Sequence, residues 1–122
     1  MIVYLEDVAP DGTPTYLTEG LLRLAHRKRS ADASTTPSSD PLHTYLKVDA
    51  APMTPGKPEL IKIGMFPIAV QLHKGERIRV AIAGADDGNL DRLPSTGDPV
   101  LTVERNFAAP SWIELPIVAA VK

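Results

Sequence analysis

The side chains that could carry acid–base, nucleophilic or metal chemistry are few and widely spaced. The imidazoles are His26, His43 and His73, and no two of them stand at the short spacing that places two metal ligands on one element. A serine nucleophile on a strand-to-helix turn requires Gly-x-Ser-x-Gly, which the sequence does not contain. We expect loop or turn positions for all of the serines: Ser30, Ser34, Ser38, Ser39, Ser95 and Ser111. The sequence therefore predicts no catalytic residue, no metal ligand and no cofactor-binding residue.

One acidic stretch has part of the spacing of a calcium-binding loop. With Asp87 as the first ligand, Asn89 and Asp91 fall at the third and fifth positions and Asp98 at the twelfth. The sixth position needs glycine for a sharp turn, but Arg92 stands there. We therefore expect a turn rich in aspartate and asparagine that connects two strands, with calcium binding as the alternative.

A basic run and a set of aromatic side chains offer two further kinds of site. The run Arg27-Lys28-Arg29 could bind an anion, although three cations in a polar loop of a slightly acidic protein are more often solvated. The aromatic side chains are Tyr4, Tyr16, Tyr45, Phe66, Phe107 and Trp112. We expect them in the core or at its rim, with a carbohydrate-stacking platform as the alternative.

The composition limits the class of protein. The chain has 122 residues, a formal net charge of −2 and no cysteine, which fits one domain without disulfides or thiolate metal sites. It lacks the basic excess of nucleic-acid-binding surfaces and the apolar run of about 20 residues that a membrane span needs. We expect neither a nucleic-acid nor a membrane partner. Glu6 and Asp7 stand where a signal peptide would be basic, which favours a cytoplasmic location.

The elements that must position these side chains are short. Twelve prolines and eight glycines punctuate the chain, which leaves little room for long helices. Apolar or alternating runs predict strands at residues 2–8, 15–25, 59–65, 66–72, 76–83, 100–105 and 112–118, with a short extended piece at 45–48. Six to eight short strands without a clear helix indicate an all-β fold, an antiparallel sandwich or barrel.

Two of these runs carry specific expectations. Residues 76–83 show the clearest alternation, with Ile78, Val80 and Ile82 on one side and Arg77 and Arg79 on the other. In residues 15–25 we expect a bulge or bend at Gly20, with a helix as the alternative. Long loops are predicted at residues 26–44 and 86–99, and long loops on a β scaffold often carry binding surfaces.

Several phrases, in order along nearly the whole chain, resemble one family of domains. They are VYLEDVAPDG at 3–12, YLTEGLLR at 16–23, FPIA at 66–69, KGERIRV at 74–80 and PSWIELP at 110–116. Together they resemble the C-terminal non-catalytic domain of the X-Pro dipeptidyl-peptidase and cocaine-esterase group of serine hydrolases, which includes acyl esterases. Two departures stand out: Glu76 occupies a position where the family often has histidine, and Ile68-Ala69 replace its usual Thr-Ser.

The resemblance implies a jelly-roll-like, galactose-binding-domain-like β-sandwich over residues 1–122 that packs on an α/β-hydrolase domain, in cis or in trans. In the family the catalytic triad belongs to that upstream domain, so no catalytic residue is carried over. The resemblance also implies that the family's first strands lie upstream of the match. We therefore expect an incomplete sandwich without hydrolytic activity of its own.

Two functional hypotheses follow. In the first, the chain is the accessory domain of a peptide- or ester-cleaving hydrolase, and its loops at 26–44 and 86–99 face the catalytic domain and its substrate cleft. In the second, it is a free-standing module that binds carbohydrate or protein, which would require exposed aromatic side chains. Because an incomplete sandwich leaves strand edges unpaired, we also expect a homo-oligomer.

Overall fold

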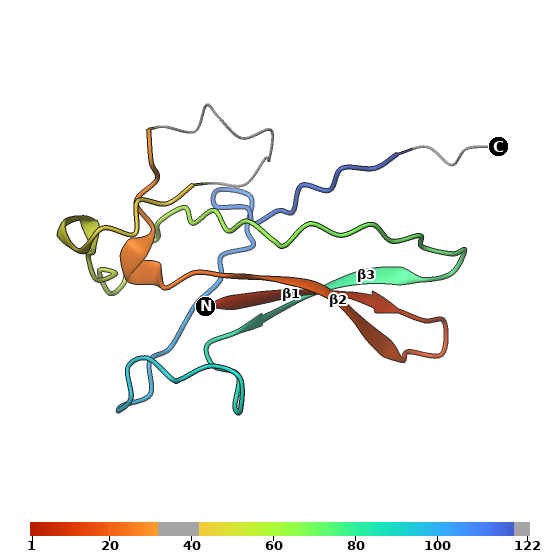
Figure 1. The fold of residues 1–122 in the computed structure, drawn as a ribbon, viewed down its shortest axis with the longest axis horizontal. Helices are drawn as coiled ribbons and strands as arrows, with labels where there is room; N and C mark the ends of the chain where they lie inside the picture. The colour runs from red at the N-terminus through yellow and green to blue at the C-terminus, as the bar shows by residue number, and fades with distance from the viewer. Residues whose placement is uncertain (32–41, 119–122) are drawn as a thin grey trace.

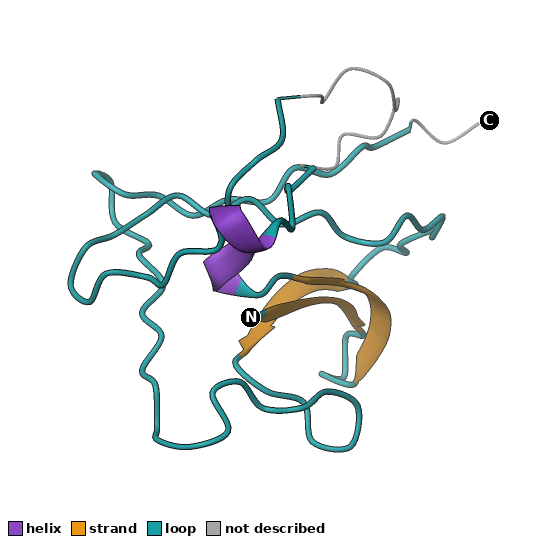
Figure 2. Ribbon diagram, turned by 60° about the vertical axis from the view of Figure 1, so that its left-hand side comes forward, coloured by secondary structure: helices purple, strands orange, loops and turns teal. Residues whose placement is uncertain are grey.

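The three strands in the described part of the chain form one antiparallel sheet. The computed structural model describes residues 1–31 and 42–118, and Figure 1 shows its strands, which are β1 (Ile2–Val8), β2 (Pro14–Leu21) and β3 (Arg77–Ala83). Two single-turn 3-10 helices, η1 (Leu24–His26) and η2 (Lys47–Asp49), lie between β2 and β3 in the chain. Figure 2 shows the sheet as one curved ribbon, with loops making up most of the rest. The fold is thus all-β, as predicted.

Strands β1 and β2 form a hairpin whose turn is set by local chemistry. Gly12 has a φ of 93° and donates its N–H to the Ala9 carbonyl at 2.9 Å, a conformation that glycine adopts without steric cost. The Asp11 carboxylate accepts the N–H of Thr13 at 2.8 Å, the usual role of aspartate in a turn. The turn signal in the sequence is therefore confirmed.

The bulge in β2 is not at the predicted position. Leu5 pairs with Thr18 and Glu6 pairs with Tyr16, which leaves Leu17 as the extra residue. Gly20 pairs regularly with Val3, so the prediction of a bulge there is wrong. A different constraint accounts for that glycine: the chain at Gly64 lies directly over it.

Strand β1 lies in the centre of the sheet, because the strand order is β2-β1-β3. Side chains of directly paired residues share a face, and the register pairs Leu5 with Val80 and Glu6 with Arg79. The predicted alternation of β3 is therefore confirmed, with its aliphatic side chains on one face and its arginines on the other. Four apolar residues are buried among those described: Ile2, Leu5, Val8 and Leu22.

Several predicted strands do not form in the part of the chain that the structure describes. Residues 59–65, 66–72, 100–105 and 112–118 carry no strand, and the piece at 45–48 runs into η2. Pro67 and Pro116 lack the N–H that a ladder requires, and an alternating run without a neighbouring strand has no partner for its backbone groups. Six to eight strands were predicted and residues 1–31 and 42–118 contain three, so the jelly-roll arrangement stays a prediction. No helix in the described ranges has the length and apolarity to cross a membrane.

Candidate interaction surface

One face of the sheet carries paired polar side chains between the buried Ile2 and Val8. The Glu6 carboxylate accepts a hydrogen bond from Arg79 Nε at 2.5 Å. This bond lowers the pKa of Glu6 and raises the pKa of Arg79. The Tyr4 and Tyr16 rings meet edge to face, with centroids 6.5 Å apart. Four groups on this face therefore have partners within the sheet: Tyr4, Glu6, Tyr16 and Arg79.

A contact from this face anchors the acidic loop. The Tyr4 hydroxyl donates to Asp86 Oδ2 at 2.7 Å, which raises the pKa of Tyr4 to about 12 and lowers the pKa of Asp86. Further along the loop, Arg92 binds the Asp98 carboxylate at 2.8 Å, so the residue at the sixth calcium-loop position pairs with the one at the twelfth. Within residues 1–31 and 42–118 no three acidic or imidazole side chains come together to hold a metal ion.

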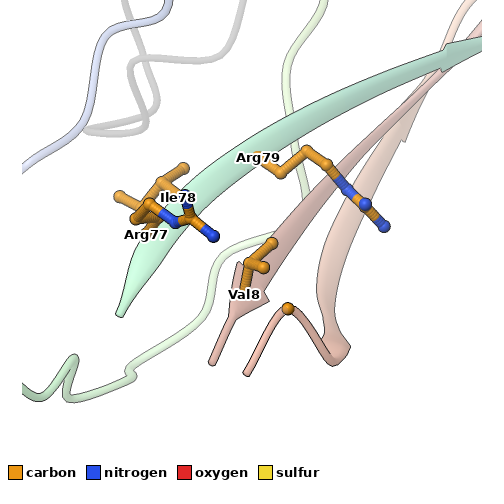
Figure 3. Close-up of a pocket in the computed structure, with 5 residues that line it drawn as sticks. Val8, Arg77, Ile78 and Arg79 are labelled. Atoms are coloured by element: carbon orange, nitrogen blue, oxygen red, sulfur yellow. The ribbon is translucent and has the colours of Figure 1, made fainter. Parts of the chain in front are cut away.

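The hollow at the turn end of the hairpin is a shallow surface feature. A cavity of about 330 Å³ is lined by Val8, Gly12, Arg77, Ile78 and Arg79. Figure 3 shows the two guanidinium groups well apart, with that of Arg79 extending across β1. Because Arg79 is also held by Glu6, the two arginines do not converge on a common anion.

The predicted basic cluster is structural at its first two residues. Arg27 donates to both carboxylate oxygens of Glu59, at 2.7 and 3.0 Å, and to the Ala51 carbonyl at 2.6 Å. This pairing lowers the pKa of Glu59. Lys28 binds the Asp49 carboxylate. Residues 27 and 28 thus tie the chain after β2 to residues 49–59. The Arg27 side chain is only 17% exposed, whereas that of Lys28 is 61% exposed and stays solvated beside its ion pair.

The remaining candidates from the sequence lie apart from one another. His43 is buried, with Nε2 3.0 Å from the Lys62 carbonyl, and its ring meets that of Tyr45. His73 lies in a turn where its N–H is accepted by Glu76. The Ser111 hydroxyl donates to the Glu104 carbonyl at 2.6 Å. Three of the serines, Ser34, Ser38 and Ser39, lie outside the described residues. Five aromatic side chains were expected in the core or at its rim, and none of them is in the core: Tyr16, Tyr45, Phe66, Phe107 and Trp112 are all exposed.

The other face of the sheet is apolar and only half covered. Over β2, the chain at residues 63–66 closes it: the Thr18 hydroxyl donates to the Phe66 carbonyl at 2.8 Å. Leu5 and Thr18 are consequently only 5% and 4% exposed. Over β3 nothing comparable is present among the described residues, and Ile78, Val80 and Ile82 are 40%, 41% and 43% exposed.

Uncovered apolar surface extends beyond the sheet. Residues 66–72 expose an alternating set of large apolar side chains, Phe66, Ile68, Val70 and Leu72. The surface with the clearest capacity for binding is therefore apolar and extended.

Comparisons with known proteins relate the chain to a non-catalytic domain. Residues 1–112 match the family described as the X-Pro dipeptidyl-peptidase C-terminal non-catalytic domain. The chain is 38% identical over 116 residues to two curated proteins, "Putative serine esterase Mb1866c" of Mycobacterium bovis and "Putative serine esterase MT1883" of Mycobacterium tuberculosis. In both cases 95% of this chain is aligned, but it spans only 18% of the length of the relative. No solved structure matched the chain.

Proposed function

The chain belongs to the family of X-Pro dipeptidyl-peptidase C-terminal non-catalytic domains, and from this premise we propose that it is the accessory β-domain of a serine hydrolase of the dipeptidyl-peptidase or acyl esterase type. Residues 1–122 act as one such domain. The partner is an α/β-hydrolase domain, in the same polypeptide or on another. The chemistry belongs to that partner, and this chain contributes position and shape.

The observation that carries the proposal is the uncovered apolar surface in a chain that matches a non-catalytic domain. Exposed apolar side chains on β3 and in residues 66–72, among them Ile78, Val80 and Phe66, are surface that association would remove from water. Two mycobacterial relatives, each named as a serine esterase, align with this chain over 18% of their length. The remainder of such a protein is large enough to supply both a catalytic domain and the cover for this surface.

The contribution to catalysis is positional. Substrate clefts depend on loops held in place by rigid elements, because small displacements of positioning groups reduce rates strongly. The loop after β3 is fixed to the sheet by the bond from Tyr4 to Asp86, and the chain after β2 is fixed by Arg27 to Glu59. We place the cleft-facing surface at these two loop regions, 86–99 and the described parts of 26–44.

A chimera tests this function directly. The segment of the M. tuberculosis relative that aligns with this chain is replaced by residues 1–122, and ester hydrolysis is compared with that of the native relative and of a form lacking the segment. We expect the chimera to hydrolyse esters well above the deletion form, and this chain alone to show no turnover above buffer. A folded but inactive chimera beside an active native relative, or turnover by the chain alone, would contradict the proposal.

A free-standing binding module is the second candidate, because Tyr16, Tyr45 and Trp112 are exposed. Carbohydrate-binding surfaces need exposed aromatic rings. Burial of all three side chains would have excluded a carbohydrate-binding surface built from them. Tyr16 stacks on Tyr4 in the sheet whereas Tyr45 contacts His26 and His43, so these two do not form a single platform. Binding of soluble glycans by the isolated chain, lost on Trp112→Ala, would favour this module over the accessory domain.

A further inference from the structure

The outer edge of β3 is an unpaired strand edge. In the sheet order β2-β1-β3 both outer strands are edges, but Phe66 donates its N–H to the Glu19 carbonyl of β2 at 2.9 Å. No backbone segment among residues 1–31 and 42–118 bonds to the outer side of β3. Unpaired edges of this kind are templates for another strand. We propose that two copies of this chain pair here, with β3 antiparallel to β3 and the two-fold axis at Val80.

The side-chain pattern of β3 selects this register. Directly opposite residues share a face, so a shift by one residue would set the arginines opposite aliphatic side chains. A shift that centres the axis on Arg79 would set two guanidinium groups against each other, and one centred on Ile78 would pair Arg77 with Arg79. Both place like charges directly opposite, which is destabilising. An axis at Ala81 avoids this but shortens the ladder.

The axis at Val80 avoids like charges and pairs the whole of Arg77–Ala83. On the apolar face Val80 meets its own copy and Ile78 meets Ile82, whereas on the polar face Arg77 meets Ala83. Arg79 meets Ala81 of the second copy and keeps Glu6 of its own chain as its ionic partner. The contact is self-complementary, as a two-fold interface must be.

The open half of the apolar face gives the pairing a driving force besides the backbone bonds. Ile78, Val80 and Ile82 are each about two-fifths exposed, and in the paired sheet those of both copies form one continuous stripe. This inference concerns the outer edge of β3 and not the loops assigned to the cleft, but it draws on the same exposed apolar side chains of β3 that support the proposed function. The two are told apart by their tests, because cross-linking reads strand pairing and the chimera reads ester hydrolysis.

Cysteine cross-linking tests the register without interference, because the chain has no cysteine of its own. Val80→Cys should yield a covalent dimer of twice 13.1 kDa on oxidation or with a short bifunctional maleimide, and reduction should reverse the disulfide. Arg77→Cys alone should remain monomeric on denaturing gels, but a mixture of Arg77→Cys and Ala83→Cys should cross-link. Val48→Cys, on a largely exposed loop residue, measures random collision.

Different results would overturn the dimer itself and its proposed register. Wild-type chain that is monomeric by light scattering at high micromolar concentration, or Val80→Cys that cross-links no more than Val48→Cys, overturns the proposal. A dimer in which Arg77→Cys links to itself overturns this register. Circular dichroism under reducing conditions shows whether Val80→Cys has folded. If it has not, a mixture of Ile78→Cys and Ile82→Cys takes its place, and failure of that mixture to link also overturns the proposal.

Discussion

A Cβ atom added to Gly20 would lie 2.3 Å from the carbonyl oxygen of Gly64. No Cβ approaches backbone that closely, so glycine at position 20 allows residues 63–66 to close over β2. This closure buries Thr18 and Leu5. The covered half of the apolar face therefore depends on the absence of a side chain at Gly20.

Gly20→Ala should destabilise the fold by about 1–3 kcal/mol, the usual cost of forcing extra atoms into a packed region. Urea unfolding followed by circular dichroism measures the midpoint. Gly84→Ala is the matched control, because its added Cβ meets nothing within 4 Å. Equal midpoints for the two variants would show that residues 63–66 do not rest on Gly20.

Arg27→Lys should lower the melting temperature at neutral pH, because lysine cannot bind both Glu59 oxygens and the Ala51 carbonyl together. The pKa of Glu59 is lowered by Arg27, so this stabilisation is present above the carboxyl pKa of the unfolded chain. It is lost as pH falls through the lower pKa of the folded state. The difference between variant and wild type should therefore shrink in acid. Arg23→Lys, at an exposed position, should match wild type throughout.

Asp7→Asn and Asp11→Asn should have opposite effects. Burial, and then Glu76, raise the pKa of Asp7, so the ionised form opposes folding and wild type gains stability as pH falls through that pKa. Asp7→Asn should raise the melting temperature at neutral pH and lose this advantage in acid. The pKa of Asp11 is lowered by the Thr13 N–H, so Asp11→Asn should lower the melting temperature at neutral pH. A thermal shift of the same sign for both variants would refute this account.

Asp86→Asn should return the pKa of Tyr4 from about 12 toward the usual value near 10. The raised pKa reflects the hydrogen bond to Asp86, so stability from this contact is lost as pH rises from the unfolded value through about 12. Tyrosinate absorbance against pH measures the change, and Tyr4→Phe identifies which transition belongs to this residue. Asp98→Asn, which touches Arg92 and not Tyr4, should leave the transition in place.

Much of the sheet could be predicted because its signals are local. The Pro10-Asp11-Gly12 turn fixes the hairpin within a few residues, and the alternation of β3 records which face is apolar. The family resemblance, confirmed by the match over residues 1–112, likewise rests on short phrases in order. What alternation does not record is the partner of a strand. Residues 100–105 alternate as β3 does, yet they carry no ladder in the structure.

The polar contacts were harder to predict because their partners are distant in sequence. Arg27 meets Glu59, 32 positions away, and Tyr4 meets Asp86, 82 positions away. A basic run in a polar loop gives no sign that one of its cations is held by a carboxylate from another segment. The bulge predicted at Gly20 was wrong for a similar reason. A glycine in a strand indicates either a bulge or the close approach of another backbone segment. Only the position of Gly64 in the fold distinguishes these two explanations.

The position of β1 between its two neighbours also sets the order in which the chain can fold. The hairpin with β2 closes over the short turn at residues 9–13, whereas the ladder with β3 must first close the long segment that separates β2 from Arg77. Longer loops cost more entropy to close, and non-local pairing slows folding. Substitutions in the hairpin turn should therefore act mainly on the refolding rate, and those in β3 mainly on the rate at which the sheet opens.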